Sequence, residues 1–480
     1  MNKANFSDPI SIRRQMAADP HRPQFHFLPP HNWMNDPNGL FYWQERYHLF
    51  YQYNPDQPLW GNIHWGHASS QDLLHWIDHP VALAPDEGQG DENGCWSGCI
   101  VDDSGLPSAI YTGFINSVHT PVMLARAQDP ALVAWEKSPH NPILDEKPAG
   151  VNDTDFRDPY VWRENDRWKM VLGAGMADGD GAVLLYESPD PQSWEYLGPL
   201  FKAQTRPSVT MWECPNFFKL GDAYVLMVSL FPDIQGVYYY VGDYDGRNFT
   251  PQSEGFVDHG DVFYAPQVRT FDDGRTIMFG WLLESRSDAA LEAAGWAGVQ
   301  TVPRELYLDE SYRLLSRPIP EICSLWQLED QFEYISVDPG APLFLEPQGR
   351  QLDIEIELAK AGGMAGLGLL ASPDGSEMTR IYYDHHAGTL NLDTTHASLS
   401  PDVQAGVQSA PLSDDDDESL SLRILLDGSV IEIWFDDGLA ISGRAYPENR
   451  ASDKLFLFSE GETALFRSLT IHTMRSTWPE

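Results

Sequence analysis

The stretch W-M-N-D-P-N-G, from Trp33 to Gly39, is the first of three acidic motifs that stand at matching points of a repeating strand pattern. The other two are F-R-D-P (Phe156 to Pro159) and W-E-C-P (Trp212 to Pro215). Each motif precedes two apolar and aromatic runs that flank a short polar turn, which predicts a β-hairpin. Two further hairpins, Cys99 to Phe114 and Gln267 to Leu282, continue the series.

The five hairpins recur with a nearly constant period. One residue at the start of each hairpin marks the repeat: Asp36, Ser97, Asp158, Glu213 and Ala265. Successive members of this series are 61, 61, 55 and 52 residues apart. Aromatic residues that close polar turns repeat with spacings of 59, 59 and 55, at Trp76, Trp135, Trp194 and Phe249. Repeats of four strands at roughly this period are typical of propeller blades. A propeller would bring the three carboxylates to one axial pocket, whereas each motif taken alone is also compatible with an ordinary turn.

The chain divides into two regions of all-β character. Residues 1–24 are a polar lead-in, residues 25–318 form the predicted five-bladed propeller, and residues 319–330 form a linker with a short helix. Two predicted strands, Val302 to Leu308 and Arg313 to Pro318, close the propeller.

Residues 331–480 are predicted to form a β-sandwich. Apolar residues alternate with polar ones from Leu352 to Leu358 and from Leu420 to Leu426, and Asp427-Gly428 then marks a hairpin turn. Short alternating strands without helices are typical of a sandwich. The acidic run Asp414 to Glu418 is interpreted as a solvated loop, with a calcium site as the alternative.

Charge and hydropathy exclude several classes of partner. The formal net charge is −40, which repels nucleic acid and anionic membranes and favours a neutral small-molecule substrate. The same charge also fits a salt-adapted host. No apolar run reaches the length of a membrane span, and the first residues lack the apolar segment of a signal peptide, so we expect a cytoplasmic protein. Oligomeric state stays open.

The four cysteines, Cys95, Cys99, Cys214 and Cys323, do not have the spacing of a zinc site or of a disulfide framework. Cys214 follows Glu213 directly and is either a tuner of that carboxylate or a buried packing thiol. Histidines near the motifs (His26, His31, His64 and His67) are candidate metal ligands, but no H-x-x-x-H helix is visible, and we expect packing or hydrogen bonding to be the role of each. We therefore expect no metal and no cofactor.

Three carboxylates around one pocket suit glycoside hydrolysis. A retaining enzyme uses one carboxylate as nucleophile and one carboxylic acid to protonate the leaving oxygen. Neighbouring negative charges raise the pKa of the acid and keep it protonated near neutral pH. A third carboxylate can hold sugar hydroxyls as positive charge develops on the ring. The rival use of three carboxylates is calcium binding, but these motifs contain no dense cage of oxygen ligands.

The motif set resembles the invertase/fructanase family, glycoside hydrolase family 32. The residues that carry the resemblance are the three acidic motifs together with Trp60 to Trp76, Trp96 to Gly98, P-R-E-L (Pro303 to Leu306) and Ser429 to Gly438. The resemblance covers nearly the whole chain. It implies a five-bladed propeller followed by a β-sandwich, and release of β-linked fructose with retention of configuration.

The resemblance also implies roles for single residues. Asp36 matches the nucleophile, Glu213 the acid/base and Asp158 the transition-state stabiliser. The residues that fall where the family lines its fructose pocket are Asn35, Gln52, Trp60, Trp96, Ser97, Arg157 and Trp281. Propeller packing is the alternative for all of these lining residues, above all for Gln52 and Trp281. Many relatives have Asp after E-C-P, whereas this chain has Asn216, which removes a charge near the acid/base.

The substrate is not decided by these motifs. We expect sucrose and short fructo-oligosaccharides, with a sucrose-6-phosphate hydrolase or a fructosyltransferase of the same family as alternatives. More distant alternatives are an inverting arabinosidase or xylosidase on a related propeller, and a sugar-binding propeller without catalysis.

Overall fold

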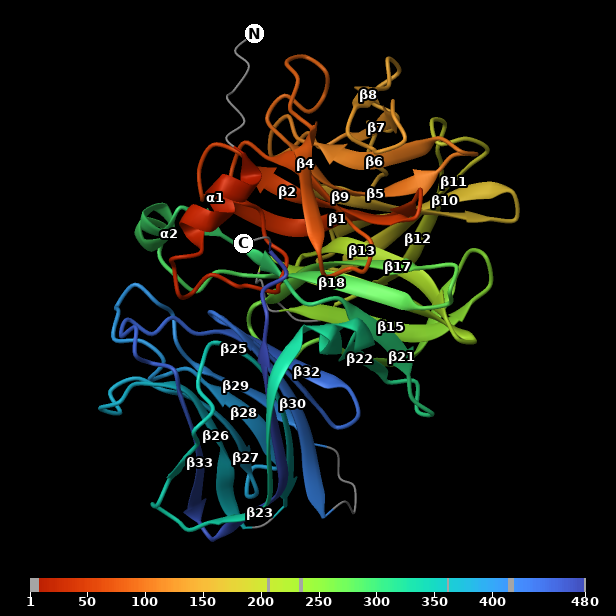
Figure 1. Ribbon diagram of the computed structural model, residues 1–480. Helices are drawn as coiled ribbons and strands as arrows, with labels where there is room; N and C mark the ends of the chain where they lie inside the picture. Colours follow the sequence, from red (N-terminus) through yellow and green to blue (C-terminus); the bar gives the residue numbers. More distant parts are fainter. Residues whose placement is uncertain (1–7, 205–207, 233–235, 361, 413–417, 479–480) are drawn as a thin grey trace.

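The computed structural model describes residues 8–204, 208–232, 236–360, 362–412 and 418–478. It has two bodies, a propeller formed by the first two thirds of the chain and a β-sandwich formed by the rest (Figure 1). The all-β fold class predicted from the sequence is confirmed. Neither of the two α-helices in the described ranges, α1 (Pro9–Met16) and α2 (Asp288–Ala294), has the length and apolar character of a membrane span.

Five sheets form the propeller, and each contains four antiparallel strands. The first contains β1 (Asn32–Trp43), β2 (Arg46–Asn54), β3 (His64–Ser70) and β4 (Trp76–Leu83). The second contains β5 (Cys95–Asp102), β6 (Pro107–Gly113), β7 (Val122–Ala127) and β8 (Trp135–Lys137). The third contains β9 (Val151–Glu164), β10 (Arg167–Met176), β11 (Gly181–Ser188) and β12 (Glu195–Ala203). The fourth contains β13 (Met211–Leu220), β14 (Ala223–Phe231), β15 (Val237–Tyr244) and β16 (Phe249–Phe256). The fifth contains β17 (Phe263–Thr270), β18 (Thr276–Leu282), β21 (Arg304–Leu308) and β22 (Leu314–Pro318).

The innermost strands close a ring. β1 contacts β5, β5 contacts β9, β9 contacts β13, β13 contacts β17, and β17 returns to β1. The segment after α2 joins the last sheet to the first: β19 (Trp296–Ala297) pairs in parallel with β1, and β20 (Val299–Gln300) pairs with β18. The predicted hairpins, with their turns, and the closing strands are therefore present.

The second aromatic register marks the entry to the outermost strands. Trp76 and Trp135 begin β4 and β8, Trp194 directly precedes β12, and Phe249 begins β16. The indole nitrogens of Trp76 and Trp135 each donate to the carbonyl oxygen three residues earlier, so the ring closes its own turn. The two periodicities of the sequence thus correspond to the inner and outer edges of the blades.

Two six-stranded sheets pack face to face in the sandwich. One contains β23 (Trp326–Val337), β34 (Ala464–Met474), β25 (Gln351–Ala359), β30 (Ser419–Asp427), β31 (Val430–Phe435) and β32 (Leu439–Arg444). The other contains β24 (Leu343–Phe344), β33 (Lys454–Gly461), β26 (Gly363–Ala371), β27 (Thr379–Asp384), β28 (Thr389–Asp393) and β29 (Val407–Pro411). The alternating apolar residues of β25 and β30 face the hydrophobic core of the sandwich.

The segments at both ends of the chain pack on the propeller. In α1, Arg13 is buried, pairs with Asp78 of β4 at 2.7 Å and stacks on the ring of Trp478. A 3-10 helix, η1 (Pro320–Leu325), lies in the expected linker, and β23 begins directly after it. The domain boundaries predicted from the sequence stay a prediction. Of the acidic run Asp414 to Glu418, Glu418 belongs to the described residues and the others lie outside them.

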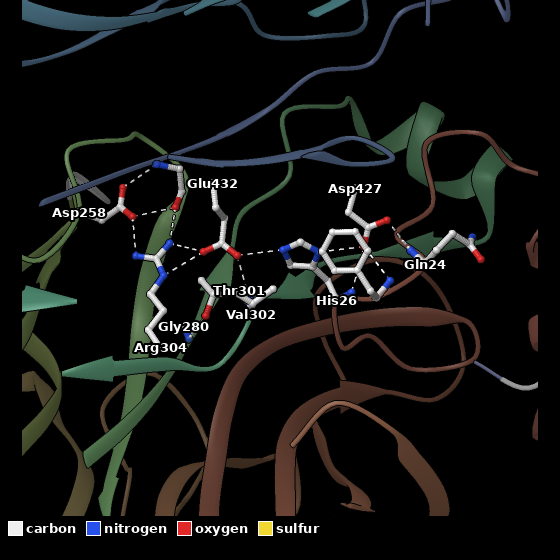
Figure 2. A network of polar contacts seen from close by, with 11 residues as sticks. Gln24, His26, Asp258, Gly280, Thr301, Val302, Arg304, Asp427 and Glu432 are labelled. Carbon is white, nitrogen blue, oxygen red and sulfur yellow. Dashed lines mark hydrogen bonds and ion pairs between the residues drawn. The ribbon is translucent and has the colours of Figure 1, made fainter. Parts of the chain in front are cut away.

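A fully buried ion network joins the two bodies (Figure 2). Arg304 of the propeller pairs with Glu432 of the sandwich and, at 2.8 Å, with Asp258. His26 places one ring nitrogen 2.9 Å from Asp427 and the other 2.9 Å from Glu432. The P-R-E-L motif and the Ser429 to Gly438 stretch therefore meet at this interface, where a single hydrophobic cluster also crosses from propeller to sandwich.

Candidate active site

Every inner strand of the propeller loses its regular pairing at the same level. Two residues of the inner strand there stand opposite one residue of its neighbour, which is the geometry of a β-bulge. The paired residues flanking the irregularity are Met34 and Pro37, Cys95 and Gly98, Arg157 and Tyr160, Glu213 and Asn216, and Tyr264 and Gln267. Residues from all five bulges line two cavities between the inner strands, whereas a regular strand would alternate its side chains between two faces.

The register corrects the alignment of the repeat: Asp36 and Ser97 are the second residues of their bulges, whereas Asp158 and Ala265 are the first. The two residues inside its bulge are Cys214 and Pro215, and Glu213 is the last paired residue before them, opposite Ser229. Asp158 and Pro159 occupy the bulge of the third blade, so Cys214 is the structural counterpart of Asp158. Both residues have positive φ angles, 65° for Asp158 and 45° for Cys214. Glu213 therefore stands one position before its bulge, which is one residue earlier than Asp158 and two residues earlier than Asp36 stand in theirs.

Asp36 is the most completely fixed of the three carboxylates. Its Oδ2 accepts the hydroxyl of Ser97 at 2.5 Å and the amide of Gln52 at 3.0 Å, and its Oδ1 accepts the amide of Asn35 at 2.9 Å. Gln52 is the residue of β2 that stands opposite the bulge, so the bulge itself aims this donor at Asp36. A carboxylate with both oxygens held cannot rotate freely, which suits a nucleophile.

Asp158 and Glu213 are held by the neighbouring blades. The main-chain nitrogen of Cys214 donates to Asp158 Oδ2 at 3.0 Å. Arg157 donates from Nε and Nη2 to Glu213 Oε1, at 2.9 and 2.7 Å, and the hydroxyl of Tyr264 lies 2.6 Å from Glu213 Oε2. Arg157 thus compensates one of the three negative charges and fixes the side chain of Glu213.

Cys214 contacts the other two carboxylates rather than Glu213. Its Sγ lies 3.4 Å from Asp36 Oδ2 and 3.6 Å from Asp158 Oδ2. Burial and the nearby charges of Asp158 and Asp36 raise its pKa well above the usual range, so the sulfur keeps its proton and can donate it. The sequence leaves two roles open for Cys214, tuning of Glu213 and packing as a buried thiol. In the structure Cys214 packs against the hydrophobic cluster beside the pocket, and its Sγ contacts Asp36 and Asp158.

Burial and mutual repulsion act on the acidic groups. The pKa of Asp158 is raised to about 7, chiefly by burial; Arg157 opposes the shift, and the charges of Glu213 and Asp36 contribute to it. Burial also raises the pKa of Asp36, against the hydrogen bonds from Ser97 and Asn35. Burial and the neighbouring charges therefore let Asp158 keep its proton up to nearly neutral pH.

A cavity of about 440 Å³ opens over the carboxylates. Nine of the ten predicted site residues line it, and Ser97 lies behind Asp36 as its hydrogen-bond donor. The nine are Asp36, Asp158, Glu213, Asn35, Gln52, Trp60, Trp96, Arg157 and Trp281. Gln52 and Trp281, for which packing was the strongest alternative, are thus both in the wall of the pocket.

Three aromatic residues that line the cavity were not predicted as site residues from the sequence: Trp33, Phe231 and Tyr264. Tyr264 had a usable signal in the sequence, because Tyr264-Ala265-Pro266 precedes its hairpin as Glu213-Cys214-Pro215 precedes the hairpin of the fourth blade. Trp33 lies within the first motif, but its contact with the pocket depends on packing against Trp281 across the blade junction. Phe231 ends β14, and no sequence pattern distinguishes it from a strand end that points elsewhere.

The mouth of the pocket is aromatic. Trp96 stacks on Phe114 with ring centroids 4.1 Å apart, and Trp60 meets Trp96 edge-on at 6.0 Å. Trp60 remains 54% exposed, which is unusual for so large an apolar side chain. Flat aromatic faces that are held but open to solvent are suited to the apolar faces of sugar rings.

Asn216 does not line this cavity. Its amide donates to the carbonyl oxygens of Cys214 and Pro266, at 3.1 and 2.8 Å, and its oxygen accepts the main-chain nitrogen of Val268 at 2.9 Å. It therefore ties β13 to β17. An aspartate could not donate to the two carbonyl oxygens, so the asparagine is explained by the contact between blades.

Three carboxylates, an arginine and aromatic walls around a sugar-sized pocket at the axis of a propeller define a glycoside hydrolase site. The sequence matches the family description "Glycosyl hydrolases family 32 N-terminal domain" over residues 26–318 and "Glycosyl hydrolases family 32 C terminal" over residues 327–473. The chain therefore belongs to glycoside hydrolase family 32.

Individual relatives agree with this assignment. The chain is 36% identical to a sucrose-6-phosphate hydrolase of Escherichia coli, with 92% of this chain and 93% of the relative covered. It is 34% identical to an acid beta-fructofuranosidase of Vicia faba, with 95% and 81% covered. Its structure matches fructan 1-exohydrolase IIa from Cichorium intybus with a TM-score of 0.87, at 29% identity and with 95% and 98% of the two chains covered.

Proposed function

We propose that this chain hydrolyses terminal, non-reducing β-D-fructofuranosyl bonds with retention of configuration, through a covalent fructosyl-enzyme intermediate. The observation that carries the proposal is the state of Asp36, which is buried, has both oxygens held, and shares one cavity with Asp158 and Glu213. The names of the relatives, a beta-fructofuranosidase, a sucrose-6-phosphate hydrolase and a fructan exohydrolase, support fructose as the released sugar.

The mechanism assigns one step to each carboxylate. Asp36 attacks the anomeric carbon of fructose, while Glu213 gives its proton to the leaving oxygen. Glu213 then takes a proton from water, which attacks the same carbon and releases Asp36. Asp158 holds ring hydroxyls, a contact that strengthens as the sugar becomes positively charged. Retention requires carboxyl groups of Asp36 and Glu213 about 5–5.5 Å apart.

We propose sucrose and short fructo-oligosaccharides as substrates. Trp60 lines the cavity and stays largely exposed, so its ring can stack on the sugar that follows fructose. A phosphorylated substrate would need a free cation, but among the described lining residues the cation is Arg157, and Glu213 already engages it. The name of the Escherichia coli relative favours sucrose 6-phosphate instead, and that sugar is the second candidate. A fructosyltransferase would use the same catalytic residues.

Two measurements test the proposal. NMR during the first turnovers of sucrose should show β-fructose as the initial product, whereas initial α-fructose would assign the protein to the inverting class. The values of kcat/KM should be higher for sucrose and kestose than for sucrose 6-phosphate and inulin. A preference for the phosphorylated sugar would reverse the substrate assignment, and a kestose-forming reaction that outpaces hydrolysis would identify a transferase.

The cytoplasmic location expected from the sequence stays a prediction. So does the absence of nucleic-acid and membrane partners, which rests on the net charge of −40. The oligomeric state is open, and gel filtration with light scattering measures it directly.

A further inference from the structure

The backbone beside Asp36 is supported from outside its own blade. The bulge in β1 takes Asn35 and Asp36 out of the ladder with β2, since Met34 pairs with Tyr53 and the next pair is Pro37 with Tyr51. The carbonyl oxygen of Asn35 accepts a hydrogen bond from Nε2 of Gln300 at 2.7 Å. A side chain 265 positions away thus satisfies a polar group that the bulge removed from the sheet.

Gln300 is well placed to give rigid support. Its side chain is fully buried. Its main-chain nitrogen donates to the carbonyl oxygen of Phe27 at 2.9 Å, and β20 pairs it with Trp281 of β18. Two residues later, the main-chain nitrogen of Val302 donates to Glu432 of the sandwich at 2.8 Å (Figure 2). The segment that carries Gln300 is therefore anchored to the last blade and to the second domain.

The supported residue acts directly on Asp36. The side-chain amide of Asn35 donates to Asp36 Oδ1 at 2.9 Å, and its oxygen accepts the indole N–H of Trp33 at 2.7 Å. The other oxygen of Asp36 is held separately by Ser97 and Gln52. A shift of the Asn35 backbone would therefore release Oδ1 while leaving the contacts of Oδ2 in place.

We propose that Gln300 is a positioning residue for the nucleophile: by holding the Asn35 carbonyl, it keeps the Asn35 amide directed at Asp36 Oδ1. The proposal rests on the nucleophilic role proposed for Asp36. Gln300 is absent from the residues that line the cavity, so its effect passes through Asn35. Loss of the Gln300 contact frees the bulge to move and weakens a hydrogen bond that favours the ionised form of Asp36.

The test compares Gln300→Met with the wild-type protein. Methionine is similar in length and cannot donate a hydrogen bond. We expect kcat on sucrose to fall about 10- to 100-fold, in the range of a displaced catalytic geometry, with a smaller change in KM. The acid limb of the pH profile of kcat/KM should move to higher pH, because Asp36 loses a contact that stabilises its charge.

A matched control is Gln408→Met. Gln408 is also buried and also donates from Nε2, to Asp261 Oδ2 at 2.8 Å, at the contact between sandwich and propeller. Its loss removes one glutamine hydrogen bond between the domains but none near Asp36. We expect a lower melting temperature, with kcat and the acid limb as in the wild type.

The outcomes separate positioning from simple stability. A folded Gln300→Met protein with an unmoved acid limb and kcat within twofold of the wild type overturns the proposal, and so does an equal effect from Gln408→Met. If Gln300→Met does not fold, Gln300→Asn decides by the same two readouts, because it keeps the amide but cannot reach the carbonyl. An active Asp36→Ala protein would instead refute the proposed function, whatever Gln300 does.

Discussion

Asp158 combines burial with two neighbouring carboxylates, and its ionisation is therefore costly in the folded state. Its pKa is raised from 3.8 to about 7. A raised carboxyl pKa means that the folded protein holds a proton that the unfolded chain has already released. The resulting loss of stability begins as pH rises above 3.8 and is complete above about 7.

Asp158→Asn should accordingly be more stable than the wild type at neutral pH. The amide has the same shape and carries no charge, so it removes the penalty of ionisation. We expect the difference in melting temperature to grow from pH 4 to pH 7 and then to stay constant. Turnover of sucrose should fall by orders of magnitude, since an amide cannot stabilise the positive sugar. A difference in melting temperature between Asp158→Asn and the wild type that stays constant from pH 4 upward would show that the pKa of Asp158 is not raised.

Glu213→Gln tests proton donation to the leaving group. General acid catalysis contributes about 10²–10⁴-fold, and we expect a loss of this size on sucrose, whose glucose oxygen is a poor leaving group. The loss should be much smaller on an aryl fructoside with an activated leaving group. Parallel kinetics on the two substrates give the answer, and equal losses would mean that Glu213 acts at another step.

The bulged inner strand is the element on which the site depends. It positions Asp36, Ser97 and Asp158 within one level of the propeller, and it requires close backbone approach. At Gly98, which ends the bulge of β5, an added Cβ would lie 2.2 Å from the carbonyl oxygen of Ile110 and 2.5 Å from the Cα of Tyr111. Both are backbone atoms, so an alanine can be accommodated only if β5 and β6 separate.

Gly98→Ala should therefore disturb the strand that carries Ser97. We expect a lower melting temperature and a kcat reduced at least about tenfold, because misplacing a catalytic contact by about 1 Å is worth up to 10²-fold. The control is Gly406→Ala in the sandwich, where the nearest atom to an added Cβ is a side-chain nitrogen 3.8 Å away. Gly406→Ala should match the wild type in both readouts. A fully active and stable Gly98→Ala protein would show that the bulge tolerates displacement.

At the level of the whole molecule, His26 links the two domains through a buried charge network. Both ring nitrogens face carboxylates, Asp427 and Glu432, and Arg304 lies behind Glu432 with Asp258 beyond it. Burial opposes the charge on His26, but the hydrogen bonds to Asp427 and Glu432 and their charges outweigh it and raise its pKa above 6.5. Only the protonated ring can donate to both carboxylates.

The contribution of His26 to stability should therefore disappear in alkaline solution. A raised histidine pKa gives stability that is fully present below pH 6.5 and is lost as pH rises through the folded-state value. We expect the melting temperature of the wild type to fall above pH 6.5 more steeply than that of His26→Gln, which cannot titrate. Parallel curves for the two proteins between pH 6 and pH 9 would contradict a charged His26. Substitution of exposed carboxylates of the sandwich should leave kcat unchanged, because these side chains lie outside the buried network.

The sequence by itself determined the propeller, the sandwich and the three acidic motifs. Hairpins, polar turns and alternating strands are local patterns, and their period can be counted along the chain. Only the tertiary structure decided that Cys214 lies between Asp36 and Asp158, that Glu213 stands one position outside its bulge, and that Trp33 and Phe231 complete the pocket. It also decided that Gln300 supports Asn35 and that Glu432 meets Arg304. These features depend on the register between strands and on contacts between segments far apart in the chain, and no local pattern of residues encodes either.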